Sequence, residues 1–230
     1  MVALINIDKA TEELKKYFNF DKIVDLKLPS KPYYTENEIL EISKIIPEDN
    51  FYIYGSDKKH FITLAILIKI KPKYYLHIDQ HPDDYSLMKG INTGSFARFI
   101  KKLANVKEMF YVGFLKPETN SFDKYILIRK DRSNWGNVIN FLKELPNELY
   151  VSIDLDILKR DFVCNRYNNY AFLLDLNELL IILREIKGKI AFIDITGFEY
   201  LRSCDFKKNI YTLKEVMRIC TAENDEASRG

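Results

Sequence analysis

The sequence is poor in the residues that build disulfide scaffolds, membrane spans and secretory signals. Its three cysteines are odd in number and form no C-x-x-C pair, so a disulfide framework is not expected and a reducing cytoplasm is the natural compartment. The longest apolar stretch, Phe61 to Ile70, is broken by Lys69 and is too short to cross a bilayer. Met1 to Lys16 mixes acidic and basic residues, which is not the pattern of a secretory signal.

The sequence also lacks a charge excess of either sign. Lys and Arg number 35 against 33 Asp and Glu, so neither a nucleic-acid partner nor an acidic tail is expected, and no membrane partner either. Hydrophobic residues make up 47% and charged residues 30% of the chain, which is typical of a globular protein. We expect one α/β domain over residues 1–230, with a helical N-terminal lead-in over 1–48 and a flexible tail over 222–230.

Short apolar segments alternate with amphipathic segments along the chain. The pattern predicts strands over 51–54, 74–78, 109–112, 125–128, 149–153 and 190–195. It predicts a first helix over 9–18 and a second helix that begins at the capping box of Thr35 and Glu38. Further helices are predicted over 60–70, 93–104, 135–145, 176–186 and 211–220. This alternation favours a three-layer α/β/α fold with a mostly parallel sheet, whose active site would lie at the carboxyl ends of the strands.

Two of the three histidines fall in one short segment after the strand expected at 74–78. There Asp79, His81 and Asp83 alternate along the chain, so extended backbone would direct all three side chains to one point. Two carboxylates and one imidazole suit a divalent metal of the Mn, Fe, Co or Zn type. The alternative is an ordinary polar loop. His77, inside the strand, is interpreted as a packed strand histidine in preference to a group behind the metal ligands.

Two other strand ends carry residues of the same kind. Asp154 and Asp156 follow the strand expected at 149–153 and again lie on one side of the chain, although a strand-end carboxylate can also simply cap the next segment. His60 follows the strand expected at 51–54, where, taken alone, it is better explained as a polar residue at the start of a helix. Carboxyl ends of parallel strands meet at one sheet edge, so the three groups together predict one shared metal centre.

This order of motifs resembles that of the arginase, agmatinase and formimidoylglutamase (ureohydrolase) family. The family motifs Gly-Gly-Asp-His-Ser, Asp-Ala-His-x-Asp and Ser-x-Asp-x-Asp look like Gly55 to Thr63, Asp79 to Asp83, and Ser152 to Asp156. The resemblance covers about residues 50 to 220. The second and third motifs are specific, whereas the first is distorted.

The resemblance implies an arginase-like fold and a site for two divalent metal ions, usually Mn²⁺. His60 and Asp83 would bind one ion, His81 and Asp156 the other, and Asp79 and Asp154 would bridge them. A bridging hydroxide would then attack a guanidinium, formimino or amide carbon of a small-molecule substrate, with Asp83 as a catalytic residue that accepts its hydrogen bond. Relatives are commonly homo-oligomers.

Four further residues are candidates for binding the substrate, although they match the family motifs less well than the ligands do. Glu199, six residues before Asp205, looks like the family's Glu in Glu-Val-Asn-Pro-x-x-Asp, which grips a guanidinium; a surface Glu after a strand is the alternative. Thr93 stands where the family has a proton-shuttling His and cannot do general acid/base work near neutral pH. Arg160 and Arg166, in a loop unlike that of relatives, could hold an anionic group or be simply solvated.

Three functions therefore stay open. The first is a metal-dependent hydrolase of linear, non-peptide C–N bonds. The second is a metal-binding or assembly protein of the same fold that has lost turnover. The third is a deacylase, which ranks last because the His-His pair usual at the reacting centre of the related deacetylases is missing from this sequence.

Overall fold

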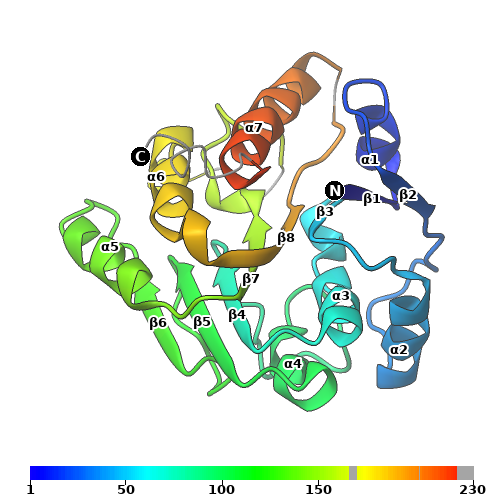
Figure 1. The fold of residues 1–230 in the computed structure, drawn as a ribbon, viewed down its shortest axis with the longest axis horizontal. Helices are drawn as coiled ribbons and strands as arrows, with labels where there is room; N and C mark the ends of the chain where they lie inside the picture. The colour runs from blue at the N-terminus through cyan, green and yellow to red at the C-terminus, as the bar shows by residue number, and fades with distance from the viewer. Residues whose placement is uncertain (166–169, 202, 222–230) are drawn as a thin grey trace, which may run out of the picture.

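A single sheet of eight strands runs through the molecule, and every strand pairs in parallel with its neighbours (Figure 1). The computed structural model describes residues 1–165, 170–201 and 203–221, so the tail expected over 222–230 lies outside the described residues. The strands are β1 (Val2–Asn6), β2 (Lys22–Asp25), β3 (Phe51–Tyr54), β4 (Tyr74–Ile78), β5 (Glu108–Gly113), β6 (Lys124–Leu127), β7 (Leu149–Asp154) and β8 (Ile190–Thr196). Their order across the sheet is β2-β1-β3-β8-β7-β4-β5-β6.

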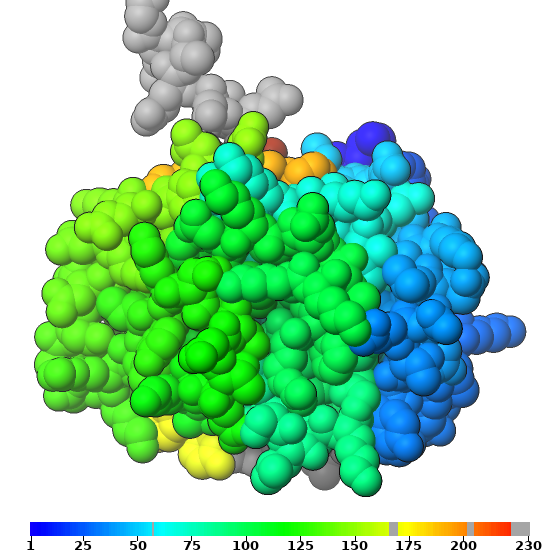
Figure 2. Space-filling view, turned by 90° about the horizontal axis from the view of Figure 1, so that it is seen from below, coloured from blue at the N-terminus to red at the C-terminus, as the bar shows by residue number. Residues whose placement is uncertain are grey.

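Helices cover both faces of this sheet, which confirms the predicted three-layer α/β/α fold. The helices are α1 (Lys9–Leu14), α2 (Glu36–Ile45), α3 (Ile62–Ile70), α4 (Ala97–Ala104), α5 (Trp135–Glu144), α6 (Leu176–Ile186) and α7 (Ser203–Thr221). One core cluster joins one face of the sheet to α1, α5, α6 and α7, and the other joins the opposite face to α2, α3 and α4. Figure 2 shows the molecule from the side of α2 and α4, where the blue N-terminal segment adjoins the green middle of the chain.

Alternate residues of the buried strands serve the two faces. In β3, for example, Ile53 belongs to the first core cluster and Tyr54 to the second. Parallel strands buried on both faces read as continuous apolar runs, and this is why β3 and β7 were recognisable in the sequence. The predicted capping box also forms, since the Thr35 hydroxyl accepts from the Glu38 N–H at 3.3 Å and the Glu38 carboxylate accepts from the Thr35 N–H at 2.9 Å.

The N-terminal 48 residues are not the helical lead-in that the sequence suggested. They contribute β1 and β2 to the sheet as well as α1 and α2. The apolar residues of Val2–Asn6 form a run too short for its periodicity to separate a strand from a helix. β2 lies at the edge of the sheet and alternates half-buried and exposed residues, so its apolar signal is weak.

Several helix starts also differ from the prediction, and two of these differences bear on the site. His60 does not open a helix: it lies in a turn between the 3-10 segment Asp57–Lys59 and α3. The helix predicted over 93–104 begins only at Ala97, so Thr93 lies before α4. In the part of the chain that the structure describes, no helix is both long enough and apolar enough to cross a membrane.

Candidate metal centre

The predicted ligands come from three strands at the centre of the sheet. β3, β7 and β4 all end at the same edge, with β8 between β3 and β7. His60 follows β3, and the segment from Asp79 to Asp83 follows β4. Asp154 ends β7, and Asp156 lies in the 3-10 segment directly after it. All six predicted ligands are buried except His81, whose side chain is 28% exposed. The parallel topology thus brings together residues that are up to about 100 positions apart in the sequence.

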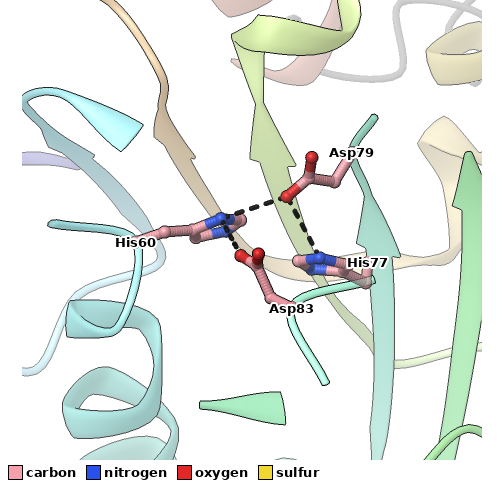
Figure 3. A group of neighbouring side chains, drawn as sticks. All are labelled: His60, His77, Asp79 and Asp83. Carbon is pink, nitrogen blue, oxygen red and sulfur yellow. Dashed lines mark ion pairs between the residues drawn. The ribbon is translucent and has the colours of Figure 1, made fainter. Parts of the chain in front are cut away.

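His60 lies at the centre of the first group. Its Nδ1 atom is 3.0 Å from Asp83 Oδ2 and 3.2 Å from both Asp79 Oδ2 and Asp154 Oδ2. Figure 3 shows His60 directed at Asp79 and Asp83, which reach it from the segment after β4. One imidazole nitrogen surrounded by three carboxylate oxygens is a donor set that suits a divalent transition metal.

His81 lies in a second group on the other side of Asp79. Its Nδ1 atom is 3.0 Å from Asp156 Oδ2 and 3.7 Å from Asp79 Oδ1. Asp79 therefore faces His60 with one carboxylate oxygen and His81 with the other. The arrangement contains two neighbouring groups that could each hold a divalent cation and that share one carboxylate.

The backbone positions these carboxylates through short local hydrogen bonds. Asp79 Oδ1 accepts from the His81 N–H at 2.7 Å, and Asp154 Oδ1 accepts from the Asp156 N–H at 2.9 Å. Asp83 adopts a positive φ of 50°, which few residue types tolerate as well as Asp and Asn. The two hydrogen bonds limit the rotation of the Asp79 and Asp154 carboxylates before any ion is bound.

The charges of the clustered carboxylates and histidines indicate whether a divalent cation would fit between them. Burial and the neighbouring Asp79 raise the pKa of Asp83 to about 6, and burial and Asp154 raise the pKa of Asp156 well above its usual value. His60 Nδ1 is fully buried and has no hydrogen-bond partner among the described residues, although it faces three carboxylates. Divalent cations would neutralise the crowded carboxylates and give this nitrogen a partner, so the residues present fit a metal.

A buried polar network behind the ligands was not predicted from the sequence. His60 Nε2 lies 3.1 Å from the hydroxyl of Ser152, which donates to Asp194 Oδ1 at 2.8 Å. Asp194 also accepts from the hydroxyls of Tyr54 at 3.2 Å and Tyr150 at 2.5 Å. The register could have pointed to it, because Ser152 and Asp194 lie opposite each other on adjacent strands.

His77 takes part in this surrounding layer as well. It is fully buried in β4 and packs against aromatic rings, as its interpretation as a packed strand histidine requires. Its Nε2 atom, however, lies 3.2 Å from Asp79 Oδ2 (Figure 3) and 3.2 Å from the His81 carbonyl oxygen. His77 therefore also contacts a predicted ligand, so the two interpretations of this residue are not exclusive.

A cavity of about 380 Å³ opens over the carboxylates. Its described lining consists of Lys31, Pro32, Tyr34, Lys58, Lys59, Phe61, Asp79, His81, Asp83, Tyr85, Met88, Asn92, Thr93, Gly94, Asp154 and Asp156. Five of the six predicted ligands thus reach the cavity, and His60 lies below them with no exposed surface. A volume in this range suits a small-molecule ligand.

The predicted substrate contacts do not all reach this cavity. Thr93 lines it, and its hydroxyl accepts a hydrogen bond from the His60 N–H at 3.1 Å. Glu199 and Arg160 are absent from the described lining. Glu199 is buried elsewhere, where its N–H donates to the Cys164 carbonyl at 2.7 Å. Arg166 lies outside the described residues.

Solved structures of known hydrolases share this architecture. An agmatine ureohydrolase of Thermoplasma volcanium matches with a TM-score of 0.69 and 14% identity, over 96% of this chain and 89% of that one. A proclavaminate amidino hydrolase from Streptomyces clavuligerus matches with a TM-score of 0.71 and 13% identity, over 95% and 90%. The chain has the ureohydrolase fold. An Entamoeba histolytica arginase, solved with L-ornithine, matches with a TM-score of 0.66 and 14% identity, over 96% and 98%.

The likeness to the ureohydrolase fold lies in the structure. No protein-family model matches the sequence, and no curated protein matches it significantly. At this level of identity the fold carries over, but an activity does not follow from it. The chemistry of the site therefore has to be argued from its own residues.

Proposed function

We propose that this protein is a hydrolase that cleaves a linear C–N bond of guanidino, formimino or amide type in a small molecule. In the proposal it uses two divalent metal ions, with Mn²⁺ as the first candidate. The observation that carries the proposal is the pair of imidazole nitrogens, each facing its own carboxylates, with Asp79 in both groups. When bound, such a metal pair lowers the pKa of a water towards neutrality and polarises the carbon to be attacked.

The distances support the division of the ligands that the sequence suggested. His60 and Asp83 would hold one ion and His81 and Asp156 the other, because each pair lies 3.0 Å apart. Asp79 would serve both ions. In the proposal Asp154 does so as well: its Oδ2 lies 3.2 Å from His60 Nδ1, while its Oδ1 orients the Asp156 backbone. In the proposal Asp83 also accepts a hydrogen bond from the water that attacks the substrate.

A second candidate function is metal binding without turnover. The observation that favours it is Thr93, which lies in the cavity lining at the place where the ureohydrolase family has its proton-shuttling His. Its hydroxyl is already engaged with the His60 N–H and does not titrate near neutral pH. In the described lining, the only imidazole is that of His81, which the proposal assigns to a metal.

Metal content tests the centre first. The protein is loaded with Mn²⁺, dialysed and analysed for bound elements, in parallel with Zn²⁺ and Co²⁺ loading. The proposal predicts close to two ions per chain in wild-type protein and in Asp161→Asn, a control whose exposed carboxylate is outside the described lining. Asp154→Asn is expected to bind less metal. A wild-type chain without bound metal would disprove the proposal.

Turnover is tested separately on the loaded protein. Arginine, agmatine, formimidoylglutamate, guanidinoacetate and guanidinobutyrate are incubated with it, and urea, formamide and ammonia are measured. Product from any of them that is lost in Asp154→Asn and kept in Asp161→Asn supports the hydrolase. Full metal content with no product from the whole panel supports the non-catalytic alternative.

A further inference from the structure

Three lysines share the cavity with the carboxylates of the candidate metal centre. Lys31, Lys58 and Lys59 all line it, and the last two directly precede His60 in the chain. Lys58 is exposed and Lys59 half-buried, so both ammonium groups have access to solvent at the mouth of the site. The cavity therefore has acidic ligands and a basic rim.

The sheet holds the segment that carries Lys58 and Lys59 in place. The Ser56 N–H donates to Asp8 Oδ2 at 2.9 Å, and the Gly55 carbonyl accepts from the Gly197 N–H at 3.1 Å. At its other end the segment is attached through the hydrogen bond from the His60 N–H to Thr93. The two lysines thus lie on an anchored turn, whose position relative to the ligands is set by the backbone.

The charge of the cavity changes sign once the centre is loaded. Its four described acidic side chains are all proposed ligands, and two divalent cations would cancel their charge. Lys31 is paired with Glu38, and its ammonium also lies 4.5 Å from the centre of the Tyr34 ring. Within the described part of the chain, Lys58 and Lys59 form no ion pair, so their two positive charges would dominate the loaded cavity.

We infer that the substrate carries an anionic group, a carboxylate or a phosphate, at the end opposite its C–N unit, and that Lys58 and Lys59 recognise it. The inference rests on the proposed function, because it needs the carboxylates to be neutralised by metal. A distal ammonium group would instead meet two lysines and no described acidic side chain beyond the ligands. The Tyr34 ring would give such an ammonium group little cation–π stabilisation, because Phe61 stacks on this ring at 4.6 Å and Lys31 lies over it.

The inference also changes where an anion would bind. The sequence suggested Arg160 and Arg166 for this role, but Arg160 is absent from the described lining and Arg166 is not described. Lysines at the cavity mouth provide the same charge without the bidentate geometry of a guanidinium. They would select for charge more than for the shape of the anion.

Guanidinobutyrate and agmatine form a matched pair of probes for this selectivity. Both carry a guanidino group on a short alkyl chain, and they differ in a distal carboxylate against a distal ammonium. Binding of each to Mn²⁺-loaded protein of measured metal content is followed by titration calorimetry in the first minutes, with product assayed in the same sample. We expect about a tenfold preference for guanidinobutyrate, since two partly exposed lysines attract one end group and repel the other.

Variants of the two lysines decide whether they cause the preference. Lys58→Gln combined with Lys59→Gln should bring the ratio close to one, and the corresponding change of both to Glu should reverse it in favour of agmatine. Lys107→Gln combined with Lys116→Gln is the control, because both lysines are exposed, lie outside the described lining and alter the net charge equally. The control should keep the wild-type ratio.

Metal content separates failure of this inference from failure of the proposed function. Equal binding, a preference for agmatine, or no binding of either probe at millimolar concentration, in protein that holds its metal, overturns the inference alone. So does a preference that survives in the Lys58 and Lys59 variants. A chain that takes up no metal overturns the proposed function, and the inference that rests on it falls too.

Discussion

Replacing Gly197 with alanine should disturb the metal centre through a single methyl group. Gly197 follows β8 with a φ of +85°, a backbone conformation that alanine adopts only with strain. A Cβ atom there would lie 1.9 Å from Asp154 Oδ1 and 2.5 Å from the Leu155 nitrogen. The Asp154 carboxylate would have to turn away, and its hydrogen bond to the Asp156 N–H would be lost.

The expected magnitude follows from these two effects. The backbone strain costs about 1–3 kcal/mol, and the lost hydrogen bond costs about 1 kcal/mol more. The free energy of unfolding of the metal-free protein should therefore fall by about 2–4 kcal/mol. Because Asp154 faces His60 at 3.2 Å, metal affinity should fall as well, beyond any effect on stability.

Urea unfolding of metal-free protein and calorimetric titration with Mn²⁺ measure the two effects separately. Gly136→Ala is the matched control, because Gly136 lies in α5 and a Cβ there would meet nothing within 4 Å. The control should bind metal like wild type and be unchanged or more stable by up to about 1 kcal/mol. If Gly197→Ala keeps wild-type stability and metal uptake, the close approach of β8 to Asp154 does not constrain the site.

Three further predictions concern the ligands and their surroundings. Asp79→Ala should abolish binding of both ions, whereas Asp156→Ala should leave about one ion per chain, because among the described residues only Asp79 faces both His60 and His81; elemental analysis compares them. Metal affinity should fall as the pH drops through about 6, where Asp83 takes up a proton that competes with the cation, and titrations in buffers of different ionisation enthalpy should show proton release. Ser152→Ala removes the partner of His60 Nε2 and should weaken Mn²⁺ binding about 10- to 100-fold, as measured by competition with a chelator.

Each of these predictions can be contradicted by a definite result. Equal metal loss in the two aspartate variants would mean that the groups are not separate. Mn²⁺ binding that is independent of pH and buffer would mean that the carboxylates do not hold protons in the metal-free state. Ser43→Ala serves as a control for Ser152→Ala, because the buried Ser43 hydroxyl on α2 donates to the Leu40 carbonyl and, within the described residues, to no group of the candidate site. The same loss of affinity in both variants would assign the effect to stability.

The parts of the fold predicted from sequence are those in which local patterns are unambiguous. The capping box at Thr35 and the largely apolar runs of β3 and β7 are local signals, and the structure confirms these elements. β1 and β2 were missed because one is a short apolar run and the other is an edge strand with little burial. Nothing local distinguishes such segments from a helix or a loop, and only pairing with β3 and with each other makes them strands.

For the candidate site, the sequence by itself determined which residue types follow each strand and therefore the predicted ligand set from His60 to Asp156. Alternation along an extended chain is a local property, and parallel strands share one carboxyl edge, so these residues could be placed together without coordinates. The tertiary structure alone decided what surrounds them: the contact of His77 with Asp79, the hydroxyl of Ser152 behind His60, and the lysines at the cavity mouth in place of Glu199 and Arg160. These depend on side chains from distant segments that meet across the sheet, and no spacing within one segment encodes such a meeting.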